Sequence, residues 1–406
     1  MKSETMLRRL FAGLRHRNYR FYWLGQLSSV LALNMEMAAQ AWLVFLLTDS
    51  PLMLGVAGIA YAVPRVSLVL VGGAIADRAD KRRIMVLTQS LLAVAYLVLG
   101  LLIITERIAF WHVLVFAFNS GFLRSFDRPS RYALLPEMVP REEIANAVAL
   151  GSSVWQACRL VGPGLAGLLI HWFGVGHTFI ACFVSSAAAV ALWAFIRSRP
   201  IVGQPQGGVW RNILAGLDFV RRNQLFYSLL GLTCFNSLFG MSYVILLPVF
   251  ARTILEVDSR GFGLLQSFSG VGALIGTLIV AYLAQAGRRG WQVLVGSAIF
   301  GSLLMLFAYS SSFALSLGLI FFLGLFNQIY LTSINTILQL NLPNELRGRV
   351  LGLFGLTWDL MPLGGAISGT VAEFAGAPTA VAMGGFLVAV LGLYGLARLP
   401  AVREIE

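Results

Sequence analysis

The sequence predicts an all-α polytopic membrane protein in which twelve transmembrane helices form two pseudo-symmetric six-helix bundles. Composition is the first reason: 58% of the 406 residues are hydrophobic and 12% are charged, and the mean hydropathy is +0.79, which excludes a soluble globular protein. Spacing is the second, because apolar runs recur about every 34 residues, enough for one bilayer crossing and a connection. A motif, Arg-Asn-x-x-Phe-Tyr, also occurs at 17–22 and again at 222–227, as expected for a duplicated transporter half.

The predicted helices are apolar runs bounded by glycine, proline or charged residues, which interrupt helices or lie at their ends. The runs of the first half cover 20–48, 52–76, 84–104, 109–131, 144–170 and 176–196. Those of the second half cover 224–250, 261–285, 291–310, 312–340, 349–373 and 377–397. The longest polar break lies between them and has the Pro, Gly and Gln content of a linker. We therefore predict an N-terminal bundle at 1–196, a cytoplasmic linker with an amphipathic segment at 197–223, and a C-terminal bundle at 224–406.

The positive charges predict how the chain is oriented in the membrane. A net charge of +12 would favour nucleic-acid binding in a soluble protein. With a cytoplasmic N-terminus, 24 of the 30 Lys and Arg residues fall in cytoplasmic segments and three in external loops, which follows the positive-inside rule. We therefore expect both termini in the cytoplasm and no nucleic-acid partner. The three cysteines are isolated in apolar segments, so neither a metal nor a cofactor is predicted.

The first predicted helix carries a polar stripe with an acid near the middle of the membrane. The stripe consists of Gln26, Ser29, Glu36 and Gln40, at spacings of three, seven and four. Burial favours the protonated form of a carboxyl group and a nearby arginine favours the ionised form. A Glu36 whose surroundings change during a cycle can therefore bind and release a proton. The alternative is a permanent structural ion pair, for which Arg65 is a candidate partner.

The fourth predicted helix carries four polar residues on one face. They are Ser120, Arg124, Asp127 and Arg131, at spacings of four, three and four. Since a charge at the bilayer centre costs about 2.5–3.5 kcal/mol on insertion scales, this face is predicted to point into the bundle. Arg124 lies deeper and is predicted to contact substrate or a carboxylate. Asp127 and Arg131 lie near the inner surface and are predicted to act in gating, with a snorkelling Arg131 as the alternative.

Uncharged polar residues of the seventh and tenth predicted helices suit hydrogen bonding to a substrate, although packing between helices explains single members equally well. Asp359 of the eleventh helix is a second intramembrane acid and, with Glu36, a candidate proton-coupling residue. The sequence leaves open whether Asp359 binds a proton or a cation or pairs with Arg159. The predicted substrate-binding residues are Gln40, Asn119, Arg124, Asn236, Tyr243, Asn327, Gln328 and Thr332.

A charged segment, GAIADRADKRR at 73–83, lies between the second and third predicted helices. An acid at a helix end beside several cations can form a charge network that holds one conformation closed. The segment closely resembles the cytoplasmic loop signature of the major facilitator superfamily, which implies that fold and a gating role. Asp80 stands where the family usually has glycine, and the equivalent second-half loop, 284–289, lacks the acid, so any latch is predicted in the N-terminal half. The predicted gating residues are Gly73, Asp77, Arg78, Arg82, Asp127 and Arg131.

The fifth predicted helix contains small residues around a proline. Its segment with Gly162, Pro163 and Gly167 resembles the fifth-helix signature of the exporter branch of the same superfamily, with Cys158 and Ala166 in place of two glycines. Small residues permit close helix contact, and proline frees a backbone carbonyl and bends a helix. We therefore predict a helix bend and a pliant contact between the halves at these residues.

Nearly the whole chain resembles bacterial drug and siderophore exporters of this superfamily, in the branch that includes an enterobactin exporter and macrolide efflux pumps. The resemblance implies a monomeric secondary transporter of the bacterial inner membrane, which exports a lipophilic or amphipathic drug-like molecule by proton-coupled alternating access. One alternative is an exporter of an anionic siderophore, because three intramembrane arginines fit an anion. Further alternatives are an importer or uniporter of a small solute, and a membrane enzyme, although the four histidines are scattered and form no catalytic set.

Overall fold

The computed structural model describes residues 12–197, 209–283 and 287–405, and the regular secondary structure in these ranges is entirely helical. The chain divides into two compact units. Unit 1 contains Met1–Gln40 and Val63–Gln206, and unit 2 contains Ala41–Ala62 and Gly207–Glu406. Two helices, α2 (Arg17–Thr48) and α3 (Pro51–Arg78), therefore each have residues in both units.

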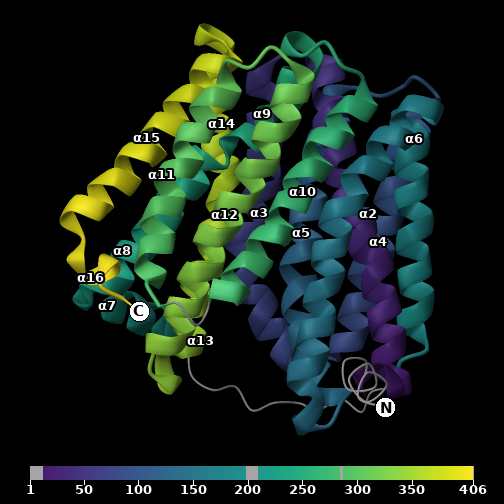
Figure 1. Cartoon of the computed structure of the whole chain (residues 1–406). Helices are drawn as coiled ribbons and strands as arrows, with labels where there is room; N and C mark the ends of the chain where they lie inside the picture. Colours follow the sequence, from purple (N-terminus) through teal and green to yellow (C-terminus); the bar gives the residue numbers. More distant parts are fainter. Residues whose placement is uncertain (1–11, 198–208, 284–286, 406) are drawn as a thin grey trace, which may run out of the picture. The chain divides into compact units, whose positions relative to one another are not determined.

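Unit 1 is completed by α4 (Lys81–Ile104), α5 (Phe110–Leu134) and α6 (Ile144–Ala194), and α4 packs along both of the others (Figure 1). Buried aromatic side chains with satisfied polar atoms tie α2 to α6. The Tyr19 hydroxyl donates to the carbonyl of Ala147 at 2.7 Å, and the Trp193 indole N–H donates to the carbonyl of Tyr22 at 3.2 Å. These contacts fix the rotation of α2, and with it the direction of its polar stripe.

Twelve membrane passes account for the helices of the described chain. Ten helices are long and apolar enough to cross a membrane. One of them includes α6, whose 51 residues would extend about 76 Å, more than twice the hydrocarbon core. Gly174 interrupts α6 with a φ of 84°, so α6 makes two passes. The second pass of α6 brings the ten helices to eleven passes, and α5 is the twelfth. Helix α5 is less apolar than the others because it carries the charged residues from Arg124 to Arg131. The predicted number of passes and all-α fold are therefore confirmed.

Unit 2 contains the remaining passes, and its helices pack closely in pairs. Helix α10 (Ser259–Tyr282) lies along α12 (Phe313–Asn341), and α11 (Arg289–Ala308) lies along both α12 and α15 (Ala377–Arg398) (Figure 1). On one end of this unit, the amphipathic α7 (Val209–Arg222) packs on α13 (Asn344–Thr357). The short α16 (Pro400–Arg403) packs against α11. The backbone N–H of Gly290 donates to the carbonyl of Ile405 at 3.2 Å, which holds the end of the chain on α11.

The seventh pass is irregular. It consists of α8 (Gln224–Phe235), a π-helical turn at Asn236–Gly240, α9 (Ser242–Val249) and a second π-helical turn at Phe250–Ile254. The backbone N–H of Met241 bonds to the carbonyl of Asn236 five residues earlier, at 2.9 Å. Such turns occur frequently at functional sites in helices, and Asn236, a predicted substrate-binding residue, is the first residue of this one.

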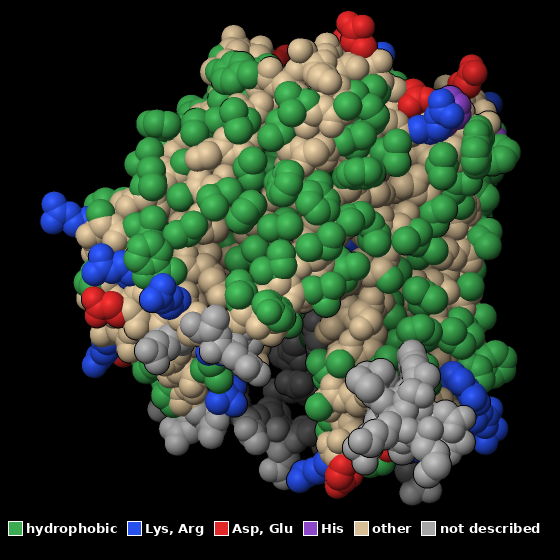
Figure 2. All heavy atoms as spheres, in the orientation of Figure 1, with side chains coloured by type: hydrophobic (Ala, Val, Ile, Leu, Met, Phe, Trp, Pro, Cys, Tyr) green, Lys and Arg blue, Asp and Glu red, His purple; other side chains and the backbone are tan. Residues whose placement is uncertain are grey.

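The outer surface of the helices is apolar, as contact with lipid requires. Exposed side chains on α10, α11 and α12 include Leu278, Leu306, Leu315 and Phe322. Figure 2 shows hydrophobic side chains spread over the middle of this face and charged side chains near the helix ends. An apolar surface of this extent is unusual on a soluble monomer and is the surface expected of a membrane protein.

Candidate functional site

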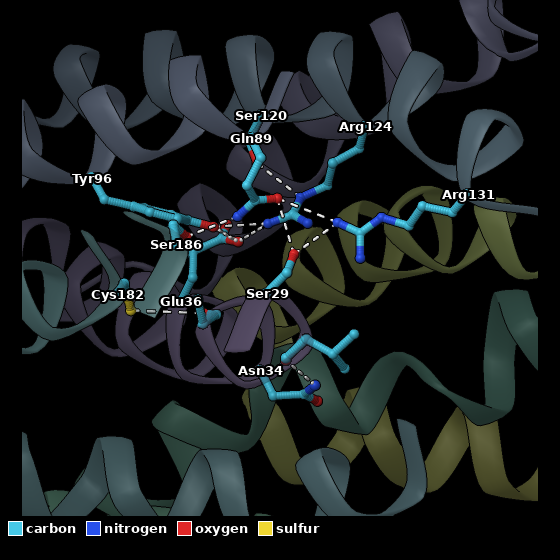
Figure 3. A network of polar contacts seen from close by, with 12 residues as sticks. Ser29, Asn34, Glu36, Gln89, Tyr96, Ser120, Arg124, Arg131, Cys182 and Ser186 are labelled. Atoms are coloured by element: carbon cyan, nitrogen blue, oxygen red, sulfur yellow. Dashed lines mark hydrogen bonds and ion pairs between the residues drawn. The ribbon is translucent and has the colours of Figure 1, made fainter. Parts of the chain in front are cut away.

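Three polar side chains from three helices of unit 1 meet in its interior. The Arg124 guanidinium donates through Nη2 to Glu36 Oε2 at 2.7 Å and to the Tyr96 hydroxyl oxygen at 2.8 Å. The Tyr96 hydroxyl donates in turn to Glu36 Oε2 at 3.1 Å. We call these three residues the Glu36 cluster, which Figure 3 shows between α2, α4 and α5.

Burial makes the Glu36 cluster energetically significant. The side chains of Glu36 and Arg124 are 3% and 8% exposed. Phe116 and Phe179 pack against Tyr96, with ring centroids 5.7 Å and 6.5 Å from the Tyr96 ring. Desolvation of two charges is costly, and the cost is recovered only by good pairing and further hydrogen bonds. A further hydrogen bond of this kind is present, because the Arg124 Nε also donates to Ser120 Oγ at 3.2 Å, one turn earlier on α5.

Two turns from Arg124 towards the end of α5, Arg131 is the centre of a second network. Its Nε lies 2.7 Å from Asp127 Oδ2, and its Nη2 donates to Ser29 Oγ at 2.7 Å and to Gln89 Oε1 at 3.3 Å. Its Cζ lies 4.5 Å from the Trp193 ring centroid, a cation–π contact. Arg131 is 8% exposed, so it does not snorkel to the surface. Figure 3 shows both arginines reaching from α5 towards α2.

The charged loop between α3 and α4 is attached to other parts of unit 1. Lys81 forms an ion pair with Glu137, and Arg82 donates to the carbonyls of Trp193, at 3.2 Å, and Ala194 at the end of α6. Asp80 is the N-cap of α4, since its Oδ1 accepts from the backbone N–H groups of Arg82 at 3.0 Å and Arg83 at 3.2 Å. The side chains of the predicted gating residues Gly73, Asp77 and Arg78 lie outside the described structure.

The N-cap role of Asp80 leads to a testable prediction. Asp80→Ala removes the acceptor for two otherwise unpaired N–H groups at the start of α4, and we expect a loss of about 1 kcal/mol of stability. Thermal unfolding of the purified protein in detergent measures this loss as a lower midpoint. Asp80→Asn keeps a side-chain acceptor and is the matched control. An equal midpoint for Asp80→Ala and the wild type would contradict the assigned role.

Uncharged polar groups occupy the interior of unit 2. The Asn236 amide donates to Asn327 Oδ1 at 3.1 Å, and the two side chains are 4% and 3% exposed. Gln328 donates to Thr332 Oγ1 at 3.0 Å within α12. Tyr243 is buried with its ring near those of Phe300 and Phe307, at centroid distances of 6.5 Å and 6.2 Å. The structure therefore brings together Asn236 and Asn327, which belong to the predicted substrate-binding set.

Other predicted site residues differ in burial. Gln40, Asn119 and Asp359 are partly exposed, and Asp359 lies in a single 3₁₀ turn, Trp358–Leu360. The small residues of the fifth pass are buried, and α6 stays helical through Pro163. A Cβ on Gly162 would lie 2.6 Å from the Cβ of Asn34 on α2. Gly162 thus allows a close contact between α6 and α2 inside unit 1.

Residue patterns in the sequence did not single out Tyr96, Gln89 or Trp193. Gln89 and Tyr96 are seven residues apart, which places both on the face of α4 that meets α2 and α5. A glutamine and a tyrosine at this spacing in a mostly apolar helix were the available signal. Trp193 carries no such signal, because its contact with Arg131 joins helices far apart in the sequence.

Residues 9–406 match the family described as transmembrane secretion effectors. The chain belongs to this family. Its members are major facilitator transporters rather than enzymes, so the resemblance seen in the sequence is confirmed.

Relatives and solved structures agree with this family. The chain is 24% identical over 358 residues to a staphyloferrin A transporter of Staphylococcus aureus, covering 87% of this chain and 86% of the relative. It is 22% identical over 416 residues to an enterobactin exporter of Citrobacter koseri, covering 100% and 97%. A bacterial homologue of the human lysosomal transporter Spinster has a TM-score of 0.71 at 15% identity, covering 95% and 96%. The human organic anion transporter MFSD10 scores 0.66 at 17% identity, covering 93% and 98%. At these identities the structural matches show the fold alone.

Proposed function

We propose that this transporter exports a small anionic siderophore by alternating access, and that the Glu36 cluster couples export to protons. The observation that carries the coupling is the buried ion pair between Glu36 and Arg124, 2.7 Å apart in the interior of unit 1. Intramembrane ionisable groups are costly and are typical of proton and substrate pathways in transporters. A single proton on Glu36 would remove one charge of this pair.

Protonation of Glu36 changes what Arg124 can bind. The Arg124 Nη2 contacts both Glu36 Oε2 and the Tyr96 hydroxyl, so a neutral Glu36 releases one charged partner of the guanidinium. Guanidinium groups bind carboxylates and other oxyanions well because their N–H donors form a planar fork. The cluster can therefore exchange an internal carboxylate for a negatively charged group of a substrate.

The proposed substrate class follows from the charges and from the relatives. Arg124 supplies a cation in unit 1, whereas Asn236 and Asn327 supply uncharged amides in unit 2. Both relatives described above carry names of siderophore transport. The composition and the acidic residues favour a drug-like substrate, whereas Arg124 and the relatives favour a siderophore. We therefore rank the siderophore above the drug-like substrate. The inward location of both termini and a monomeric state remain predictions.

A transport assay tests this proposal. Purified protein in liposomes is given staphyloferrin A, enterobactin or the lipophilic cation ethidium under an imposed pH gradient. We expect movement of a siderophore that accelerates with the gradient, and a loss of at least about tenfold in this acceleration in Glu36→Gln. Glu142→Gln, which alters an exposed acid, is the matched control. Movement of ethidium alone would refute the substrate class, and an unchanged response of Glu36→Gln would refute the coupling residue.

A further inference from the structure

Residues 399–405, which follow α15 and include α16, fold back across the start of α11, and we call them the hook. The hydrogen bond from the backbone N–H of Gly290 to the carbonyl of Ile405 joins the hook to α11. A Cβ on Gly290 would overlap the carbonyl oxygen of Val402, so the two backbones touch at this glycine. The side chain of Val402 is fully buried in a hydrophobic cluster that includes Val293 of α11. The hook is therefore a fixed part of unit 2.

The hook brings together arginines from two distant parts of the sequence. A Cβ on Gly290 would lie 3.2 Å from the carbonyl carbon of Arg403, and two further arginines directly precede Gly290 in the sequence. The Arg403 Nη1 donates to the carbonyl of Leu396 at 3.3 Å, which holds this side chain on the last turn of α15. The final residue of α15 is also an arginine. We call these four residues the arginine patch: Arg288, Arg289, Arg398 and Arg403.

The arginine patch has an excess of positive charge. Segments 287–290 and 398–405 contain four arginines and one acid, Glu404, which gives them a net charge of +3. The Glu404 Oε1 lies 3.5 Å from Arg403 Nη2, but its side chain is 72% exposed, and an exposed ion pair of this kind is weak. Figure 2 shows basic side chains gathered at the left of this face, around α16 and the adjoining ends of α11 and α15. The patch is therefore suited to an anion.

An apolar stripe on α15 leads to the arginine patch. Its exposed residues, at spacings of four, three and one along the helix, are Phe386, Val390, Leu393 and Tyr394. Arg398 follows Tyr394 by one helical turn, and Trp291, which is 46% exposed, lies at the same end of the neighbouring α11. Exposed tyrosine and tryptophan side chains are typical of the level of the lipid headgroups. The patch is therefore expected at headgroup level, with the stripe at the level of the acyl chains.

We propose that the arginine patch binds the phosphate group of an anionic phospholipid whose acyl chains lie along the stripe on α15. Guanidinium groups bind phosphate well because their N–H donors form a planar fork, and basic pockets between membrane helices bind anionic headgroups. The bound lipid joins the hook to the ends of α11 and α15 and so stabilises unit 2. A free phosphate ion shares the charge of the headgroup, but the exposed apolar stripe beside the patch favours a lipid. This inference does not depend on the transported substrate or on proton coupling.

Lipid binding to the purified full-length protein tests the arginine patch. Native mass spectrometry in a mild detergent compares the binding of dioleoylphosphatidylglycerol, which is anionic, with that of dioleoylphosphatidylcholine, which is zwitterionic. We expect the wild type to prefer the anionic lipid, and Arg288→Gln/Arg398→Gln to weaken its binding about fivefold or more, since one arginine near the membrane surface contributes about fivefold. Arg347→Gln/Arg349→Gln removes the same charge from exposed residues of α13 and is the matched control. Equal binding of both lipids by the wild type, or equal losses in the two variants, would overturn the proposal.

A variant that keeps every charge tests whether the hook builds the site. Gly290→Ala adds a Cβ that overlaps the backbone of Val402, so it displaces the hook from α11 without removing an arginine. We expect it to lower the preference for phosphatidylglycerol about fivefold, because Arg403 moves away from the other arginines. Gly318→Ala, which adds its methyl group into open space, is the matched control. An unchanged preference in folded Gly290→Ala protein would refute the role of the hook, and the arginine variants decide the site if Gly290→Ala does not fold.

Thermal unfolding in detergent distinguishes a lipid from a soluble anion. A ligand that binds only the folded protein raises the unfolding midpoint. We expect phosphatidylglycerol to raise the midpoint of the wild type, and to have a smaller effect on Arg288→Gln/Arg398→Gln. Phosphatidylcholine and inorganic phosphate at the same concentration should have little effect. An equal rise with inorganic phosphate would assign the patch to a soluble anion and overturn the lipid proposal.

Discussion

Arg124→Met is expected to destabilise the protein by about 3–5 kcal/mol, because it leaves Glu36 buried without its cationic partner. Glu36 is 3% exposed, and the Tyr96 hydroxyl would be its remaining hydrogen-bond donor among those described above. At neutral pH the acid must then stay as an uncompensated charge or bind a proton, and both reduce the free energy of unfolding. Thermal unfolding in detergent measures this loss directly.

The double variant Glu36→Gln/Arg124→Met separates stability from coupling. Replacing both partners of a buried ion pair by neutral groups is often nearly neutral for stability, so we expect the double variant to recover most of the lost midpoint. Its transport should no longer respond to a pH gradient, because no ionisable pair remains in the cluster. Equal destabilisation in the single and double variants would show that the side chains matter for packing and not for charge.

Gly324→Ala is expected to disrupt unit 2, since a Cβ at this position would lie 2.0 Å from the carbonyl oxygen of Ser269. The reciprocal contact is equally tight, with a Cβ on Gly272 at 1.9 Å from the carbonyl oxygen of Phe321. Both clashes are with backbone atoms, so α10 and α12 must move apart. Overpacking of this kind costs about 1–3 kcal/mol or more, which we expect to appear as a lower unfolding midpoint and a lower yield of monodisperse protein.

A second glycine of α12 provides the control for this prediction. A Cβ added to Gly318 would meet no neighbouring side chain or helix within 4 Å, so Gly318→Ala adds a methyl group into open space. Alanine is the better helix former by roughly 0.5–1 kcal/mol, and Gly318→Ala should leave the midpoint unchanged or raise it. Similar losses in both variants would refute the close contact between α10 and α12 as the cause.

Local patterns predicted much of the fold. The two passes at 144–170 and 176–196 were separated correctly although α6 is continuous in the structure apart from the break at Gly174. The fourth pass was found despite its charges, because the apolar residues between them keep the helical period. These predictions succeeded because hydropathy and helical period are properties of short stretches of chain, and the bilayer imposes a minimum length on each stretch.

The candidate site was only partly predictable. Periodicity placed Glu36 and Arg124 on polar faces, but it left open whether Arg65 or another arginine would meet the acid. The structure pairs Glu36 with Arg124 and adds Tyr96. Arg131 likewise has partners on three other helices. A periodic pattern defines a face of one helix, whereas a contact requires the faces of two helices at matching depth.

The sequence by itself determined which apolar segments form the twelve predicted passes, and which ionisable residues fall within those segments, because both follow from the cost of transferring local segments into lipid. Only the tertiary structure decided that Glu36 pairs with Arg124 and that Glu373 caps α3. The residues of the second contact are more than 320 positions apart. Such contacts depend on the rotation, tilt and depth at which helices pack, and backbone packing at residues such as Gly55 and Gly369 sets these quantities.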